Sequence, residues 1–179
     1  MRIAPLELDD APAAAREAAD DHARHVGRIT NMKRTLLRSL PAFRALMTWY
    51  DLRDTVRPFL GDRLTTLFAH AVSSETDCLI CSTFFRRILI ESGEDPDDLA
   101  LSDEERDVVA FGRALAVTPH RVSDDVYAPI AARYTDEQIV ALTAFGALMV
   151  ATNVINNVLR VPLDGYLEPY RRATTEATR

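Results

Sequence analysis

The chain has 179 residues, of which 47% are apolar and only six are glycine, so it suits a single folded domain with a sizeable core and not a disordered segment. It carries 27 acidic and 21 basic residues, which gives a formal charge of −6. Because the basic residues are scattered among acids and form no stripe, the composition argues against nucleic acid as a partner.

Membrane attachment and export are not indicated by the sequence either. The longest apolar stretch, from Ile139 to Ile155, is interrupted by Thr143, Thr152 and Asn153, so it is short and polar for a bilayer span. The first residues, MRIAPLELDDAP, place acids where a signal peptide needs positive charge and then an apolar run. We therefore expect no membrane anchor and a cytoplasmic location.

The first half of the chain reads as helices separated by breakers. Residues 1–25 predict an N-terminal arm or short helix. Apolar residues at spacings of three and four predict an amphipathic helix from Pro41 to Val56. Pro58 and Gly61 then interrupt the pattern, and a second helix is expected from Leu64 toward Ser73.

The second half continues the helical pattern. A third helix is expected from near Asp77 until Gly93 ends it. Two capping boxes, Ser102 to Glu105 and Thr135 to Gln138, predict the starts of helices over 99–117 and 139–158. Between them, residues 124–134 predict one short helix disturbed by a proline, and residues 163–177 predict a polar surface segment.

No window shows sustained alternation with β-branched residues, so we predict an all-α fold, a single-domain helical bundle. A helix as apolar as 139–158 must be buried on most of its circumference, either centrally in the bundle or partly against another subunit. We expect a homo-oligomer; the alternative is a monomer with one central helix.

The only two cysteines form the pair Cys78-Leu-Ile-Cys81, which in a reducing compartment is more typical of catalytic, redox or metal chemistry than of a structural disulfide. Thr76 and Asp77 are good N-cap residues, so Cys78 is expected in the first turn of a helix and Cys81 one turn later. The partial positive charge of a helix N-terminus favours thiolate over thiol and lowers a cysteine pKa. This spacing supports a two-cysteine cycle that ends in an intramolecular disulfide.

Two further residues are candidates for proton transfer beside the thiols. Glu75 lies shortly before Cys78 and either relays protons or is a solvated residue at a helix junction. His70 is the only histidine near the thiols in sequence; a lone histidine among apolar neighbours is otherwise a core or boundary residue. The acids Glu75 and Asp77 would oppose thiolate formation if they were ionised near the sulfur.

A metal site is not expected. The four histidines, His22, His25, His70 and His120, offer no HxxxH spacing, and there is no second CxxC, so ligands for a tetrahedral zinc site are lacking. His22 and His25 are expected on a solvated helical face. The sequence indicates no cofactor.

Several of these motifs follow one another in an order known from one superfamily. They are Ile29-Thr-Asn31-Met32, Ser39-Leu-Pro41, Ala71-Val-Ser73 before the CxxC, Leu101-Ser-Asp-Glu104-Glu-Arg106, Tyr134-Thr-Asp136-Glu137-Gln-Ile139 and Asn153. Over residues 26–165 the chain resembles the carboxymuconolactone decarboxylase-like superfamily, whose redox members include the alkylhydroperoxidase D proteins. The resemblance implies a domain over 26–165, with 1–25 as an N-terminal arm or helix and 166–179 as a C-terminal tail.

The resemblance also implies an all-α oligomer and assigns roles to the cysteines: Cys81 attacks peroxide and Cys78 resolves the product. The chain departs from the redox members at three relay positions. Phe85 stands where a histidine follows the second cysteine, Thr66 stands where a glutamate precedes the first, and Ile80 replaces a histidine of the alkylhydroperoxidase D proteins. These departures weaken peroxidase activity more than disulfide exchange, which needs an activated thiolate but no relay.

We therefore predict a thiol-disulfide oxidoreductase with hydroperoxidase activity as a further expectation, acting on a hydroperoxide or disulfide and regenerated by an external thiol reductant. Its catalytic candidates are Cys78, Cys81, His70 and Glu75, and its substrate would enter an apolar pocket near Phe84 and Phe85. The alternative is a catalytically degenerate helical scaffold or small-molecule-binding protein of the same superfamily.

Overall fold

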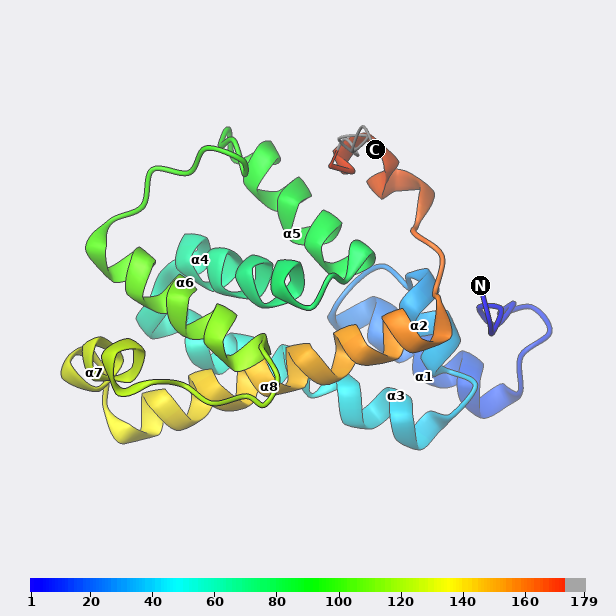
Figure 1. The fold of residues 1–179 in the computed structure, drawn as a ribbon. Helices are drawn as coiled ribbons and strands as arrows, with labels where there is room; N and C mark the ends of the chain where they lie inside the picture. The colour runs from blue at the N-terminus through cyan, green and yellow to red at the C-terminus, as the bar shows by residue number, and fades with distance from the viewer. Residues whose placement is uncertain (173–179) are drawn as a thin grey trace.

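The structure, a computed structural model, describes residues 1–172 and is built over that range from helices without a strand (Figure 1). The predicted all-α class is confirmed. The elements in chain order are α1 (Ala13–His25), α2 (Asn31–Leu36), α3 (Leu40–Met47), α4 (Trp49–Glu75), α5 (Leu79–Glu91), α6 (Asp103–Ala116), α7 (Asp124–Arg133), α8 (Asp136–Leu159) and the 3₁₀ helix η1 (Gly165–Tyr170).

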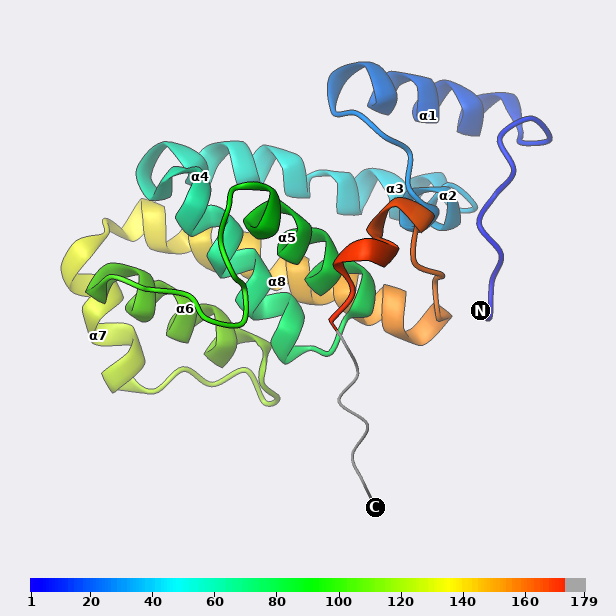
Figure 2. The same cartoon turned by 90° about the horizontal axis from the view of Figure 1, so that it is seen from above.

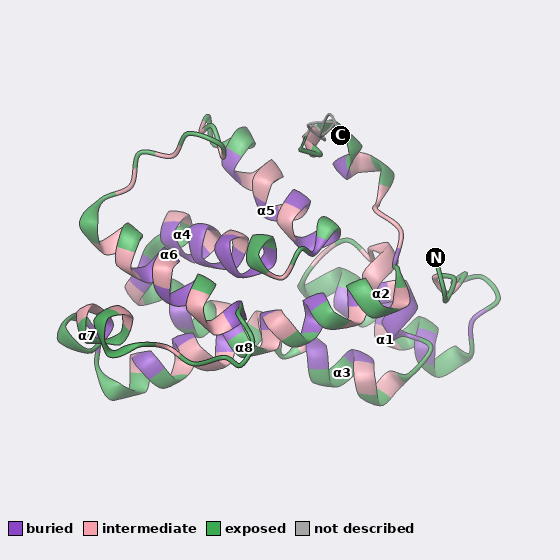
Figure 3. Cartoon of the chain, viewed as in Figure 1, coloured by how far each residue is buried: buried purple, intermediate pink, exposed green. Residues whose placement is uncertain are grey.

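The main core lies around α4 and α8, with α5 and α6 also packed on α4 (Figures 1 and 2). Figure 3 shows buried residues gathered where these helices face one another. Phe68 of α4 is fully buried at the centre, 3.0 Å from where a Cβ of Gly112 would lie and 2.9 Å from where one of Gly146 would lie. The two glycines, on α6 and α8, let both helices approach the ring closely.

A smaller cluster joins α1, α2 and α3 beside the main bundle (Figure 2). The N-terminal helix is present, but the expectation that His22 faces solvent is wrong. His22 is buried between the rings of Phe43 and Tyr50, with centroids 5.6 and 5.3 Å away. Burial lowers the pKa of His22 to about 4, so its imidazole is neutral at pH 7 and packs as an aromatic ring. His25, by contrast, is exposed as expected.

The helix expected from Pro41 to Val56 is in fact two. Its first part, α3, ends at Met47, and α4 begins at Trp49 after a turn at Thr48. The expected interruption at Gly61 is real: this residue has φ 77°, a left-handed conformation that glycine adopts without steric cost, and α4 kinks there. Beyond the kink, α4 continues to Glu75.

Both predicted capping boxes are confirmed. Ser102 and Glu105 satisfy each other's backbone N–H groups at the start of α6, and Thr135 and Gln138 do the same for α8. The short helix expected before α8 is α7, which contains Pro129 without ending there. Gly93 follows the end of α5 with φ 88°, in agreement with its expected role as a helix stop.

The C-terminal segment is helical and partly buried. Residues 165–170 form η1, which packs on α5 and buries Leu167 to 1% exposure, while Gly165, Glu168 and Pro169 are exposed, as expected of a surface segment. Leu167 supplies the apolar contact that makes this burial favourable. Residues 173–179, the rest of the predicted tail 166–179, lie outside the described residues.

Within residues 1–172, α8 is the one helix that is long and apolar enough by length and composition to span a bilayer. In its most apolar window, 39% of the residues are buried inside the domain, chiefly along α4. This is the position of a core helix of a bundle. Val140, Val154 and Val158 on its outer face remain more than half exposed.

Candidate active site

The two cysteines lie at the turn that joins α4 to α5. The chain leaves α4 at Thr76, passes through Asp77 in the left-handed region (φ 49°), and starts α5 with Cys78 as its N-cap residue. The expected cap at Thr76 or Asp77 is therefore wrong. The Thr76 hydroxyl instead donates back to the Val72 carbonyl oxygen at 3.0 Å, which ends α4 and leaves α5 to begin two residues later. Cys81 consequently sits in the first turn of α5.

Three asparagines on α8 hold this turn against the core. Asn153 donates to the Thr76 Oγ1 at 2.8 Å, and Asn157 donates to the Thr76 carbonyl oxygen at 2.9 Å. Between them, the Asn156 amide Nδ2 donates to both sulfurs, at 3.4 Å to Cys81 Sγ and 3.7 Å to Cys78 Sγ. One amide thus bridges the pair and favours a negative charge on either sulfur.

The cysteines are free thiols 3.7 Å apart, and both are buried. Cys78 is completely inaccessible, and Cys81 is 6% exposed. Only Cys81 lines the neighbouring cavity. A molecule in the cavity can therefore contact the Cys81 sulfur directly, whereas the Cys78 sulfur lies behind it.

Hydrogen bonding shifts the pKa values of the two thiols in opposite directions. The pKa of Cys78 falls to about 7, chiefly because the Cys81 thiol donates a hydrogen bond to its sulfur, while burial acts in the opposite direction. Backbone N–H groups at the start of α5 and the Asn156 amide add to the lowering. The pKa of Cys81 is raised because its thiol gives up this hydrogen bond on ionising and because its sulfur is buried. Above about pH 7 the pair holds one proton and one negative charge.

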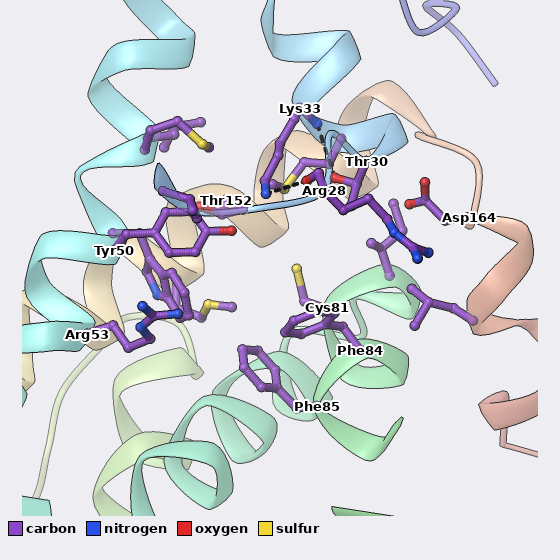
Figure 4. Close-up of a pocket in the computed structure, with 18 of the residues that line it drawn as sticks. Arg28, Thr30, Lys33, Tyr50, Arg53, Cys81, Phe84, Phe85, Thr152 and Asp164 are labelled. Atoms are coloured by element: carbon purple, nitrogen blue, oxygen red, sulfur yellow. Dashed lines mark hydrogen bonds between the residues drawn. The ribbon is translucent and has the colours of Figure 1, made fainter. Parts of the chain in front are cut away.

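The cavity has a volume of about 320 Å³, at the lower end of the range of small-molecule sites. It lies between α2, α3 and the start of α4 on one side and α5, α8 and η1 on the other (Figure 4). The predicted apolar pocket near Phe84 and Phe85 is present, with Trp49, Met47 and Met149 as further apolar walls. Its polar members include Arg28, Thr30, Lys33, Tyr50, Arg53, Arg87, Thr152, Asp164 and Tyr166.

Solved structures of other proteins share this fold. No family model and no curated protein matches the sequence. The apo debrominase Bmp8 superposes with a TM-score of 0.76 at 18% identity, covering 94% of this chain and 95% of that chain. An uncharacterized peroxidase-related protein with an alkylhydroperoxidase AhpD core, from Ralstonia eutropha JMP134, gives 0.74 at 18% identity, with 93% of each chain covered. The chain has the AhpD-like fold.

A further peroxidase-related protein, from Silicibacter sp. TM1040, gives a TM-score of 0.74 at 14% identity over 96% of this chain and 97% of that chain. A cysteine-to-alanine variant of the debrominase has also been solved in complex with 2,3,4-tribromopyrrole. The AhpD-like fold expected from the motifs is therefore confirmed. At these identities the likeness concerns the fold alone.

His70 and Glu75, the other two candidates, do not line the cavity of this AhpD-like fold. His70 lies on α4 with its Nε2 3.5 Å from the Ser74 hydroxyl. Burial and the nearby Arg86 lower the pKa of His70 to about 4, which makes it neutral at pH 7. Glu75 is an exposed residue at the last position of α4. Their catalytic roles remain predictions.

The positions at which the chain differs from the redox members provide no side chain that could replace the missing proton relay. Phe85 lines the cavity beside Trp49, with ring centroids 6.2 Å apart. The Thr66 hydroxyl donates to the Asp62 carbonyl oxygen in its own helix. The described cavity wall contains neither a histidine nor a glutamate. In residues 1–172 no group of three His, Cys, Asp or Glu side chains is placed to hold a metal.

Two residues of the site, Asn156 and Lys33, were not predicted from the sequence. Asn156 gives a weak signal, since Thr152, Asn153 and Asn156 are polar residues on one side of a mostly apolar helix, and all three are buried. Buried polar residues at helical spacing indicate a hydrogen-bonding partner across the interface. Lys33 gives no local signal, because nothing in its sequence neighbourhood separates it from a surface lysine.

Proposed function

We propose that the protein is a thiol-disulfide oxidoreductase that uses Cys78 and Cys81 and reduces hydroperoxides with an external thiol as reductant. The observation that carries this proposal is the placement of the Cys81 sulfur at the wall of an apolar cavity, with the Cys78 sulfur directly behind it. An attacking sulfur needs access to substrate, and a resolving sulfur needs only access to the attacking one.

The reaction begins with a proton shift inside the pair. Cys81 gives its proton to the Cys78 thiolate along their shared hydrogen bond and becomes the thiolate itself. It then attacks the terminal oxygen of the hydroperoxide, so that the O–O bond breaks, an alkoxide leaves and Cys81 becomes a sulfenic acid. The Cys78 sulfur next attacks Cys81, the S–O bond breaks, and the Cys78 proton leaves with the hydroxide as water. The product is an intramolecular disulfide, which a dithiol reductant opens.

The alkoxide takes its proton from water, since the described cavity wall offers no histidine or glutamate for this purpose. General acid catalysis contributes about 10² to 10⁴ in rate, so hydroperoxide reduction here is expected to be slow. Disulfide exchange has no such step. We therefore propose disulfides as the second substrate class of the same cysteine pair.

The experiment is a thiol titration of the reduced protein with cumene hydroperoxide. The native protein should lose both thiols and gain an intramolecular disulfide. Cys81→Ser should keep its one remaining thiol, whereas Cys78→Ser should lose its one thiol and stop at a sulfenic acid that dimedone traps. Fast consumption in Cys81→Ser would reverse the roles, and slow partial loss in the native protein would favour a degenerate scaffold instead.

A second candidate reaction is reductive dehalogenation of an aromatic compound. It is supported by the fold shared with the debrominase and by the aromatic wall of Trp49, Phe84 and Phe85 beside Cys81. The carbon–bromine bond would break, with bromide and a proton released, as the two thiols become a disulfide and hydrogen replaces bromine. Bromide release from 2,3,4-tribromopyrrole by the reduced protein, absent in Cys81→Ser, is the test.

Self-association and a cytoplasmic location are further parts of the proposal. The exposed valines Val154 and Val158 on α8 support association between copies, because apolar side chains on one helix face favour burial in an interface. Light scattering behind size-exclusion chromatography would measure the mass, and a monomeric mass at micromolar concentration would contradict it. A reducing cytoplasm would supply the external thiol.

A further inference from the structure

The cavity at Cys81 carries more positive than negative side chains. Arg28, Lys33, Arg53 and Arg87 line it, and Asp164 is its one acid within the described wall. Two of these cations already have partners outside the cavity: Arg53 pairs with Asp54 at 2.8 Å and Arg87 pairs with Glu91 at 2.7 Å. Arg28 and Lys33 are left without a carboxylate within 4.0 Å in the part of the chain that the structure describes.

Lys33 is the unusual member of this set because it is only 5% exposed. Its amine donates one hydrogen bond, to the Arg28 carbonyl oxygen at 2.8 Å, and lies 5.1 Å from the centroid of the Tyr50 ring. An ammonium group has three N–H donors, and a buried charge is costly unless an opposite charge accompanies it. Burial accordingly lowers the pKa of Lys33 to about 8.

Within residues 1–172, Asp164 forms no ion pair within 4.0 Å of this amine, and its charge offsets only part of the effect of burial on the Lys33 pKa. Its Oδ1 accepts from the backbone N–H of Asn31 at 2.9 Å, and its Oδ2 is buried without a hydrogen-bond partner within residues 1–172. Burial raises the pKa of Asp164, while the hydrogen bond from the Asn31 N–H acts in the opposite direction. The protein thus leaves a buried cation at the cavity wall that a ligand can pair with.

Lys33 and Cys81 approach the cavity from different walls. Figure 4 shows the amine of Lys33 descending from α2 and the Cys81 sulfur rising from α5, with the Tyr50 ring to one side. Apolar side chains, among them Phe84, Phe85 and Met149, form much of the remaining wall. A molecule that meets both groups has a charged end at Lys33 and an apolar body reaching Cys81.

We propose that the cavity binds an apolar molecule with a single carboxylate group, which pairs with Lys33 while the apolar body lies beside Cys81. As a statement about the substrate, the proposal rests on the proposed function. The preferred hydroperoxide or disulfide then carries a carboxylate group. The carboxylate takes no part in the redox step and is not altered chemically by it. Lys33 is the buried cation of the described wall, whereas Arg28 is exposed and stacks on the Tyr166 ring at 4.1 Å. One negative charge therefore matches the buried amine better than the two of a phosphate.

The test compares two unreactive probes of one shape, 4-phenylbutanoate and 4-phenylbutanamide, by titration calorimetry on the reduced native protein. We expect the acid to bind about tenfold more tightly than the amide or better, and Lys33→Met to remove that preference. Arg87→Met, which removes a cavity cation already paired with Glu91, should change the affinity for the acid by less than about threefold.

Equal binding of acid and amide, or binding of neither, overturns the proposal, and so does an unchanged preference in a folded Lys33→Met protein. If Lys33→Met does not fold, the comparison of acid and amide on the native protein decides alone, and Lys33→Arg should retain the preference. Because neither probe reacts with thiols, acid binding without any hydroperoxide consumption would contradict the proposed function and leave the carboxylate site standing.

Discussion

Asn156 on α8 donates its side-chain amide to the sulfur of Cys81 across 3.4 Å, and this bond ties the longest apolar helix of the chain to the start of α5. The same amide reaches Cys78. A hydrogen bond to a charged group is worth about 1.5 to 3 kcal/mol, and one pKa unit corresponds to about 1.4 kcal/mol. Asn156 is therefore a positioning residue for the thiolate.

Replacing Asn156 by leucine should raise the first apparent pKa of the thiol pair by about one unit, because the thiolate loses a donor that the thiol hardly needs. The ultraviolet absorbance of the thiolate, followed against pH, measures this shift directly. Asn157→Ala removes a neighbouring donor that serves only the Thr76 carbonyl oxygen and is the matched control. An unchanged thiolate titration in Asn156→Leu would show that the amide does not stabilise the charge.

The native protein should become more reactive as the pH rises through about 7. Above that value the pair is singly ionised, since the pKa of Cys78 is lowered to about 7, and below it both sulfurs are protonated and poor nucleophiles. The rate of alkylation by iodoacetamide is expected to follow the thiolate absorbance over this range. A rate that rises only near the ordinary cysteine pKa would mean that the hydrogen bond between the thiols does not form in solution.

Phe85→His should increase the rate of hydroperoxide reduction by about tenfold or more, because an imidazole one turn after Cys81 can protonate the leaving alkoxide. Steady-state consumption of cumene hydroperoxide with dithiothreitol is the measurement. Phe84→His introduces the same group on the adjacent cavity residue and should give a smaller gain. Equal rates in the native and Phe85→His proteins, with the fold intact, would mean that proton delivery does not limit the reaction.

Gly146→Ala should destabilise the fold by about 1 to 3 kcal/mol, since overpacking a filled core forces side chains from their preferred conformations. The added Cβ would lie 2.9 Å from both the Phe68 Cζ and the Leu115 Cδ1 atoms. Gly165→Ala, with no atom within 4 Å of the new Cβ, is the control and should be nearly neutral. Denaturant unfolding followed by circular dichroism would measure both; equal midpoints would contradict the predicted clash.

Local patterns predicted those helix starts that depend on neighbouring residues. The capping boxes at Ser102 and Thr135 involve side chains and backbone groups within one turn, so the sequence is sufficient to find them. The start of α5 could not be found in this way. Thr76 has the chemistry of an N-cap, but its hydroxyl is occupied by α4 carbonyl oxygens and by Asn153 from α8. One of these contacts comes from 77 residues away, where no local pattern shows it.

The same contrast holds for the candidate site. Capping residues and spacing placed Cys78 and Cys81 together near a helix N-terminus, because residues three and four apart share a helix face. The apolar pocket near Phe84 and Phe85 was also predicted. Neither the division of roles by accessibility nor the bridge from Asn156 follows from spacing. The sequence likewise predicts that His22 is a surface residue, whereas in the structure the rings of Phe43 and Tyr50 enclose it.

By itself, the amino-acid sequence determined the all-helical class, the starts of α6 and α8 and the proximity of the two thiols, since these follow from hydrogen bonds and packing within a few residues. Only the tertiary structure decided which sulfur meets the cavity, which amide bridges the pair and that Lys33 is buried there. These features arise where α2, α5 and α8 meet. Their positions depend on how whole helices pack, which no short stretch of sequence specifies.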